Sequence, residues 1–328
     1  MENSSSAFLL GGKTVYKTQT TIGHWKLRNL LSVPENTKIA TADENNIAVY
    51  NTETGHKHGL FDSLPFQPVS FSVSGPYAAV SGPQGELVVR NVALETQREI
   101  PGEKQTRNFV CIEKFDGCFF LLTASNKRKV AVYALPLCRL VEKISLPFQV
   151  NNIAVHPENK TLLCVGDSPF AILLNLFSRD GEKENSRIYS EAASCFSPAW
   201  NKTGSMLGFS CEDCFVSLWD VRALSPRPLA KIQSAQKDRK GICRSMAFST
   251  DSYGDILAYA EHANCFNVVS TRDFLVKETF LLSDQPSDIA GLSFSPDSAS
   301  LFVSSEKEVA EYSVNTFRRR KSESKTFF

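Results

Sequence analysis

Short apolar runs and short polar turns alternate along almost the whole of the 328-residue chain. One kind of turn recurs seven times, as "SVPEN" (32–36), "SVSGP" (72–76), "KFDG" (114–117), "VHPEN" (155–159), "AWNKTG" (199–204), "FSTDS" (248–252) and "FSPDS" (294–298). Corresponding turn residues, from Pro34 to Pro296, follow one another at steps of 41 to 49 residues. A period of this length is typical of the blades of a β-propeller.

Two apolar runs follow each turn. After the sixth turn they read "DILAYAEH" and "CFNVVST", and after the seventh "SLFVSSE" and "EVAEYS". Alternation and the many β-branched and aromatic residues predict strands, and the short polar links between paired runs predict hairpins. Helical periodicity is nearly absent. The sequence therefore predicts an all-β fold with seven repeated units.

The segments "FSPDSASLFVSS" and "MLGFSCEDCFVSLWDVR" resemble WD40 repeats. The resemblance implies a seven-bladed β-propeller of four-stranded blades, although only one unit keeps the Trp-Asp dipeptide and the usual Gly-His pairs are missing. The expected blades are 27–66, 67–106, 107–148, 149–193, 194–241, 242–287, and 288–317 together with 13–21. The last unit has only three strands of its own, so the N-terminal strand at 13–21 is expected to complete it and remove an open sheet edge.

The remaining segments are short. Residues 1–12 are expected to be a flexible N-terminus, 13–317 a single propeller, and 318–328 a basic tail that ends in two phenylalanines. The net charge is +1 and no run of 18 apolar residues occurs, so neither nucleic acid nor a membrane is an expected partner. The nine cysteines, without a secretory leader, indicate reduced thiols and a cytoplasmic or nuclear location.

The segment "DILAYAEHANCFNVVSTRDF" carries a narrower resemblance. It is similar to a signature of a poorly characterised family of fungal and plant WD40-like proteins, one yeast member of which is a substrate receptor of a GID-type ubiquitin ligase that recognises protein N-termini. The matching residues are Asp255, Leu257, Ala258, Glu261, His262, Val268, Val269, Thr271, Arg272 and Phe274. Ser270 stands where the signature usually has Asp. The resemblance implies a receptor that binds degron-bearing substrates and ligase scaffold subunits.

A peptide site is expected on the face that carries the links between blades. A free N-terminal amine needs carboxylate and carbonyl acceptors. The acids expected on this face are Asp43, Asp167, Glu261 and Asp288, with His262 beside them. Arg107, Asn152 and Arg244, near the starts of inner strands, are expected to hold peptide carbonyls. The alternative is that Glu261 and His262 bond neighbouring backbone and fix a hairpin.

A second candidate surface lies on the opposite face. Trp219, Asp220 and Arg222 spell a W-D-x-R motif, and Arg272 ends a degraded copy in the next unit. Such motifs resemble those by which receptors of cullin-4 ligases dock onto their adaptor, but they also occur as ordinary structural elements of a blade. In the tail, Phe327 and Phe328 could dock a partner or pack back onto the propeller, and Ser322 follows a basic run that suits a basophilic kinase.

Catalytic and metal-binding motifs are not found. Cys211 and Cys214 form a C-x-x-C pair without a second pair, and the "GGKT" at 11–14 lacks the first glycine of a phosphate-binding loop. No catalytic residue, metal or cofactor is therefore predicted. The sequence predicts a non-enzymatic protein-interaction propeller, most specifically a GID-type substrate receptor. The alternatives are a cullin-4-type receptor or a generic WD40 scaffold, and more remotely a propeller hydrolase.

Overall fold

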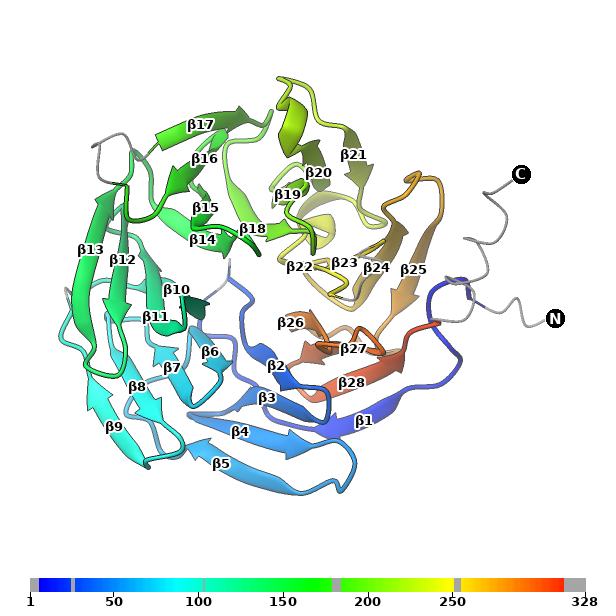
Figure 1. Cartoon of the computed structure of the whole chain (residues 1–328). Coiled ribbons are helices and arrows are strands. Elements are labelled where there is room, and N and C mark those ends of the chain that lie inside the picture. Colours follow the sequence, from blue (N-terminus) through cyan, green and yellow to red (C-terminus); the bar gives the residue numbers. More distant parts are fainter. Residues whose placement is uncertain (1–5, 25–26, 103, 179–183, 251–254, 316–328) are drawn as a thin grey trace.

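Seven four-stranded antiparallel sheets form a closed ring (Figure 1). The inner strands of a propeller surround its central channel. The computed structural model describes residues 6–24, 27–102, 104–178, 184–250 and 255–315. Within these residues the regular elements are strands and two short 3-10 helices. The predicted all-β, seven-bladed propeller is confirmed.

The strands of each blade follow one another from the channel outward. Blade 1 is β2 (Leu31–Glu35), β3 (Lys38–Asp43), β4 (Asn46–Asn51) and β5 (Lys57–Phe61); blade 2 is β6 (Ser70–Ser74), β7 (Tyr77–Ser81), β8 (Leu87–Asn91) and β9 (Thr96–Glu99); blade 3 is β10 (Arg107–Phe115), β11 (Cys118–Ser125), β12 (Lys129–Ala134) and β13 (Arg139–Ser145); blade 4 is β14 (Val150–Val155), β15 (Thr161–Gly166), β16 (Phe170–Asn175) and β17 (Glu184–Tyr189).

The second half of the chain continues the same order. Blade 5 is β18 (Cys195–Trp200), β19 (Met206–Cys211), β20 (Phe215–Asp220) and β21 (Ala230–Gln233); blade 6 is β22 (Ser245–Phe248), β23 (Ile256–Ala260), β24 (Cys265–Ser270) and β25 (Lys277–Leu281); blade 7 is β26 (Ile289–Phe294), β27 (Ser300–Ser305), β28 (Glu308–Ser313) and β1 (Thr14–Lys17); the 3-10 helices are η1 (Val221–Ala223) and η2 (Asp238–Gly241).

The middle strands of a blade are buried on both faces, and the outer strands are not. Every residue of β7 and β23 is buried, whereas every residue of β9 is exposed. A middle strand is covered by the neighbouring blade on each side, so it reads as a nearly continuous apolar run. The core therefore lies between blades. Trp219 of blade 5, for example, stacks on Phe209 at 4.6 Å within a cluster that includes Leu163 of blade 4.

Polar side chains connect the blades around the channel. Asparagines at the starts of three inner strands each donate from Nδ2 to the next blade: Asn29 to Ser70 Oγ at 2.8 Å, Asn108 to Val150 O at 2.8 Å, and Asn151 to Cys195 O at 3.0 Å. These bonds satisfy polar groups beside the channel and hold each inner strand in a fixed position relative to the next.

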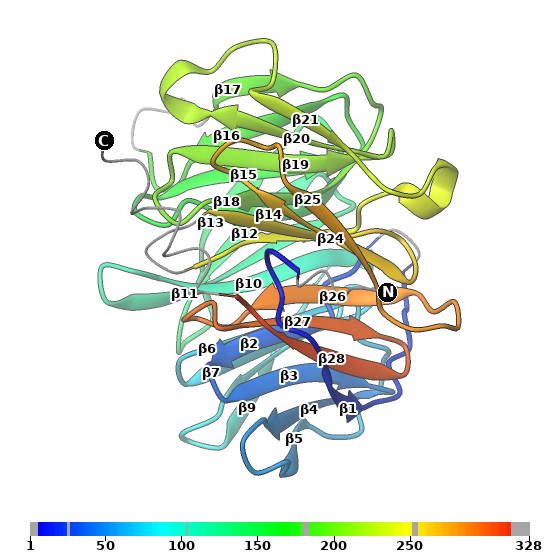
Figure 2. The same cartoon turned by 90° about the vertical axis from the view of Figure 1, so that its right-hand side faces the viewer.

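The N-terminal strand closes the ring, as the sequence predicts. β1 pairs antiparallel with β28, from Thr14 opposite Glu311 to Lys17 opposite Glu308, and Figures 1 and 2 show the two strands side by side. The buried Tyr16 on β1 donates a hydrogen bond from its hydroxyl to the carboxylate of Glu311 at 2.8 Å. The outer edge of blade 7 is thereby paired with a segment nearly 300 residues away in the chain.

Residues 6–10 differ from the expected flexible N-terminus. Phe8 and Leu9 are buried against blades 6 and 7, and Leu9 forms a β-bridge with Val314. The backbone nitrogen of Ala7 donates to Glu278 at 2.8 Å. The apolar pair Phe8–Leu9 gains burial only where blades 6 and 7 meet, which a reading of the local sequence does not reveal.

Closure by β1 should make a large contribution to stability. Replacing Tyr16 by Ala removes a buried ring and a hydrogen bond between the two ends of the chain, so we expect the free energy of unfolding to fall by about 3 kcal/mol. Val15→Ala is the matched control, because Val15 lies on the same strand with its side chain exposed. Denaturant unfolding of the two variants measures the difference, and equal losses would contradict the assignment of Tyr16 to the closure.

Candidate functional site

The chain presents its charged inner-strand ends on one face of the ring. In a four-stranded antiparallel blade, the hairpin between the second and third strands and the link to the next blade lie at the same end of the sheet. We call this side the link face. Arg28, Arg244 and Asp288 precede the inner strands of blades 1, 6 and 7, and His262 follows β23. We call these four residues the mouth cluster.

Asp288 contacts two other residues of the mouth cluster, Arg28 and His262. Its Oδ2 accepts a hydrogen bond from Arg28 Nη2 at 3.0 Å, and Nε2 of His262 lies 3.6 Å from the same oxygen. The hairpin of blade 6 holds Asp288 in place, since Ala263 and Asp288 form a β-bridge. About a third of the Asp288 side chain is exposed (36%), which makes it the most accessible acceptor of the cluster.

Arg28 is almost completely buried, with 1% of its side chain exposed. Its Nη1 donates to the carbonyl oxygens of His24 at 2.7 Å and Leu27 at 3.0 Å. Burial lowers the pKa of this guanidinium, and the neighbouring Asp288 opposes that shift. Its Nε has no hydrogen-bond partner within the described part of the chain. A cation held in this way is fixed in position and retains an unused donor.

Arg244 adds a second buried cation. Its guanidinium lies 4.2 Å from the centre of the Phe196 ring, in a cation–π contact. Burial, and then repulsion from Arg28, lower the pKa of Arg244 to about 10. Both arginines remain charged at neutral pH. Two carboxylates, Asp288 and Glu306, act on Arg28, and Glu306 also accepts from the backbone nitrogen of Asp288 at 3.3 Å.

His262 lies between these charges in its neutral form. Burial lowers its pKa below the usual value, Asp288 opposes the shift, and Arg28 and Arg244 reinforce it. At neutral pH the imidazole is therefore uncharged. Its buried Nδ1 has no hydrogen-bond partner among the described residues. A neutral imidazole at this position can donate or accept a hydrogen bond without adding to the charge.

Glu261 is a structural carboxylate. It is completely buried, Oε1 accepts from the backbone nitrogen of Ala235 at 2.6 Å and from Asn267 Nδ2 at 2.7 Å, and Oε2 accepts from the backbone nitrogen of Gln236 at 3.0 Å. The carboxylate thus fastens the link between blades 5 and 6 to blade 6. The structure places it beneath the link, and it does not offer an acceptor to the channel mouth.

The other residues expected at the peptide site lie apart from the mouth cluster. Asp43 binds Lys57 and accepts from the backbone nitrogen of Gln19 at 2.9 Å; burial raises its pKa, but these bonds outweigh burial and lower it. Asp167 accepts from Asn151 in blade 4 at 3.0 Å. The four acids therefore do not form one pocket.

A one-residue shift in register explains why Asn152 does not take the position expected for it. A β-bulge between Val150 and Asn152 places Asn151, and not Asn152, at the position that bonds the next blade. Arg107 starts β10 and is buried, but its Nη2 reaches the carbonyl of Pro101 at 3.4 Å, away from the mouth cluster. Neither residue joins Arg28 and Asp288.

Arg28 was not expected from the sequence. The repeated pattern of the blades contains a sign of this residue. The pair "RN" stands at the beginning of the inner strand at 28–29 and again at 107–108, and Arg244 occupies the corresponding position in blade 6. Comparison of blades position by position would have found it. The sequence analysis also passed over the basic hairpin "NKRK" at 126–129, which joins β11 and β12 and lies on the link face.

The W-D-x-R motif lies on the opposite face. Trp219 is buried in the core, whereas Arg222 is largely exposed (77%) and forms a two-pronged ion pair with Asp220, from Nε to Oδ1 at 3.0 Å and from Nη2 to Oδ2 at 2.6 Å. Bonds from Arg222 lower the pKa of Asp220 to about 2. Arg272 pairs with the buried Asp255 at 3.0 Å. Phe327, Phe328 and Ser322 lie outside the described residues.

A cysteine precedes Arg244 of the mouth cluster in the chain. The thiol nearest the mouth cluster along the chain, Cys243, is buried, and burial raises its pKa to about 12. The structure contains no group of three or more His, Cys, Asp or Glu residues placed to hold a metal ion within the residues it describes. Among the same residues, no helix has the length and apolar character needed to span a membrane. The arrangement at the mouth is suited to binding.

No protein-family model matches the chain. It is 25% identical over 322 residues to a protein from Schizosaccharomyces pombe described as "Uncharacterized protein C4G3.03", covering 89% of this chain and 88% of the relative. Among solved structures, it resembles a chain of one titled "Crystal Structure of Mitotic Checkpoint Complex", with a TM-score of 0.76, 15% identity, and coverage of 92% of this chain and 94% of that chain. The chain thus shares the β-propeller fold with that chain.

The role of Glu261 can be tested by a neutral replacement of nearly the same shape. In Glu261→Gln the amide group must face backbone N–H donors, leaving at least one buried donor unsatisfied, so we expect a loss of about 3 kcal/mol in the free energy of unfolding. Glu53→Gln, in an exposed turn of blade 1, is the control and should change stability little. Equal stability of the two variants would show that Glu261 does not anchor the link.

Proposed function

We propose that the protein is a non-enzymatic receptor that binds an extended peptide at the mouth cluster, and that it serves as a substrate receptor of a GID-type ubiquitin ligase. The observation that carries the peptide-binding part is the pair of buried arginines near the partly exposed carboxylate of Asp288. Arg28 and Arg244 supply donors for peptide carbonyls, and Asp288 supplies an acceptor for an amine or a backbone N–H. The protein would act in the cytoplasm or the nucleus.

The mouth cluster is preorganised for such a role. Arg28 is held by two backbone carbonyls and Asp288, and Arg244 stacks on Phe196. Neither side chain has to lose much rotational freedom when a ligand binds, which removes a usual penalty of association. Main-chain groups of an extended peptide present alternating acceptors and donors, and this cluster offers both arginine donors and a carboxylate acceptor.

The ligase part of the proposal rests on the resemblance of residues 255–274 to the receptor signature. In the structure this segment forms β23, β24 and the polar turns at their ends, and it delivers His262 to the mouth cluster. The structurally similar chain belongs to a structure whose title names a complex, which agrees with a protein partner. The fission-yeast relative carries no described activity, so it neither favours nor opposes this role.

A cullin-4-type receptor is the second candidate, because Arg222 is exposed on the opposite face. Leu229, also exposed (55%), follows on the same connection between β20 and β21 and offers an apolar contact nearby. Against this candidate, both prongs of the Arg222 guanidinium already hold Asp220. An adaptor would have to use the remaining edge of the guanidinium or displace Asp220.

Peptide binding is tested with arrays of peptides of random sequence, each synthesised with a free and with an acetylated N-terminus. We expect Arg244→Met to weaken binding at least about tenfold, equivalent to about 1.4 kcal/mol, because a donor to peptide carbonyls is lost. Asp288→Asn should selectively reduce the preference for free N-termini. Arg239→Met is the matched control, since Arg239 is exposed on the same link. Equal binding by Arg244→Met and Arg239→Met would exclude the mouth cluster as the peptide site.

The partner is tested by affinity purification of the full-length chain, a form lacking 323–328, and Arg222→Ala. We expect GID-type ligase subunits with the full-length chain and with Arg222→Ala, and their loss from the truncated form if the terminal phenylalanines are the anchor. Adaptors of cullin-4 ligases that disappear in Arg222→Ala would instead favour the second candidate. Absence of GID-type subunits from the full-length sample would refute the ligase role while leaving peptide binding to its own test.

A further inference from the structure

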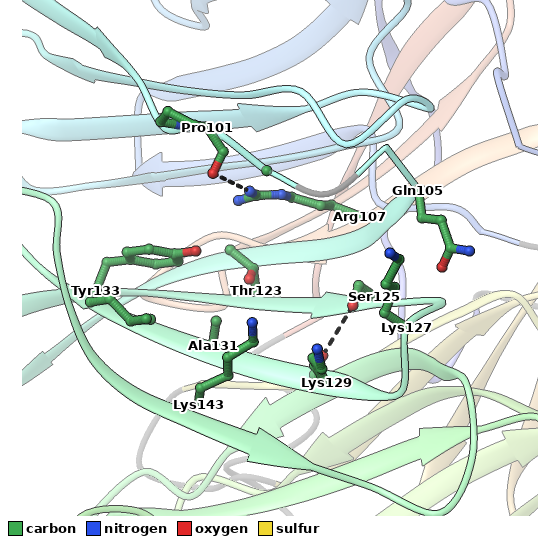
Figure 3. A pocket seen from close by; sticks show the side chains of 12 residues that line it. Pro101, Gln105, Arg107, Thr123, Ser125, Lys127, Lys129, Ala131, Tyr133 and Lys143 are labelled. Atoms are coloured by element: carbon green, nitrogen blue, oxygen red, sulfur yellow. Dashed lines mark hydrogen bonds between the residues drawn. The ribbon is translucent and has the colours of Figure 1, made fainter.

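Two cavities lie against the two faces of blade 3. The cavity toward blade 2 is lined by four basic side chains that each already interact with other groups, and Figure 3 shows Arg107 there bonded to Pro101. The cavity toward blade 4 has a volume of about 380 Å³. Its walls are the turn between β10 and β11 and the turn between β14 and β15, so it lies on the side of the ring opposite the link face. We call it the blade 3–4 cavity.

Glu113 lines this cavity from an otherwise apolar row of β10. Alternate side chains of "NFVCIEKF" (108–115) leave the same face of the sheet, which places Glu113 in one row with Phe109, Cys111 and Phe115. The three apolar members of this row pack against the core cluster that joins blades 3 and 4. The side chain of Glu113 therefore faces blade 4 from within an apolar surface.

This carboxyl group lacks a counter-charge. Among the described residues Glu113 has neither a hydrogen-bond partner nor an ion-pair partner, and burial raises its pKa to about 7. The two lysines of the lining are engaged elsewhere. Lys160 forms an ion pair with Asp116 across the two turns, and Lys114, which leaves the other face of β10, has its Nζ 5.5 Å from the centre of the Phe119 ring. A cation that enters the cavity would meet a partly desolvated carboxylate with its acceptor sites unused.

His156 holds the opposite wall of the cavity in place. Its Nδ1 accepts hydrogen bonds from the backbone nitrogens of Glu158 at 3.1 Å and Asn159 at 3.2 Å. Its ring packs edge-on against Trp200 of blade 5, with the ring centres 4.7 Å apart. Burial lowers the pKa of His156, so the imidazole is uncharged at neutral pH and does not act as a counter-ion. The wall is therefore fixed in position before a ligand binds.

We propose that the blade 3–4 cavity binds an alkylguanidinium group. The carboxylate of Glu113 can accept two parallel hydrogen bonds from a planar guanidinium, which is more weakly hydrated than an ammonium ion and enters a partly dry cavity at lower cost. Phe115, Val155 and Pro157 line the cavity and can contact the alkyl stem. Glu158, exposed in the lining, adds negative charge. The volume lies at the lower end of the range for small-ligand sites, which suits a group the size of one side chain.

The inference is independent of the proposed peptide site, because the blade 3–4 cavity and the mouth cluster lie on opposite faces and share no residue. The guanidinium has two possible sources, a free small molecule or an arginine side chain of a protein. Calorimetry with the full-length chain at physiological salt, where weak surface attraction is screened, uses free L-arginine and N-acetyl-L-arginine amide as probes. N-acetyl-L-citrulline amide is the neutral comparison of nearly the same shape. A random peptide library containing arginine is compared with the same library containing citrulline.

We expect saturable binding of N-acetyl-L-arginine amide at pH 8 that falls at least about tenfold in Glu113→Gln. Glu53→Gln, in an exposed turn of blade 1, is the matched control, and Arg244→Met should bind the probe as the unmodified chain does. Folding raises the pKa of Glu113 from 4.5 to about 7, so this group destabilises the unmodified chain progressively as the pH rises between those values. Glu113→Gln should therefore gain stability relative to the unmodified chain over this range while it loses the ligand.

The pH dependence of binding tests the same carboxylate without any substitution. A guanidinium binds the ionised form, and a group with a pKa of about 7 is about nine-tenths ionised at pH 8 and about one-tenth ionised at pH 6, so the affinity of the unmodified chain should fall about tenfold. Glu158→Gln should weaken binding less and keep this pH profile. The other titratable groups around Glu113 and the cavity are Cys111, Lys114, Asp116, His156, Glu158 and Lys160.

The two probes and the library identify the source of the guanidinium. Preference for the arginine library over the citrulline library assigns a protein ligand, and binding of free L-arginine without that preference assigns a small molecule. Three results would overturn the proposal: no saturable binding of either arginine probe up to about 10 mM at pH 8, equal binding by Glu113→Gln and Glu53→Gln, or an affinity that does not change between pH 8 and pH 6. None of them bears on the Arg244→Met test of the mouth cluster.

Discussion

Burial of both faces of every blade is the constraint on which this structure depends. A four-stranded blade exposes two apolar faces when alone, and only its neighbours can cover them. The middle strands show this directly, since β7 and β23 are buried at every position. Pairing of β1 with β28 extends the same solution to the last blade, so each blade has two neighbours. A ring closed in this way fixes the start of each inner strand, and those starts carry Arg28, Arg244 and Asp288 of the mouth cluster.

The most distinctive polar segment of the sequence, 255–274, takes its meaning from that constraint. Asp255 and Arg272 form an ion pair at one end of blade 6, and Glu261 holds the preceding link at the other end. These residues secure blade 6 between its neighbours. Only His262 extends from the segment into the mouth cluster. The residues of this motif that suggest a reactive site in the sequence therefore mostly hold blade 6 in place. For Glu261, the alternative that it fixes a hairpin fits the structure better than a contact with a ligand does.

Charge at the channel mouth is the opposite of the arrangement expected from the acids along the chain. Asp43 and Asp167 each bond residues of their own surroundings, and Glu261 lies beneath a link. Arg28 of blade 1 and Arg244 of blade 6 come together instead. These two blades are far apart in sequence, but each adjoins blade 7 in the ring.

The sequence by itself determined the all-β class, the seven units and the closing strand. These follow from local alternation and a period near 40 residues, both of which are written directly in the order of residues. It did not determine which polar residues meet. A bulge at Val150 moved the bonding role from Asn152 to Asn151, and the carboxylate of Glu261 was buried beneath a link. Side-chain partners depend on register, bulges and the angle between blades, and these are decided only when all seven sheets pack into one ring.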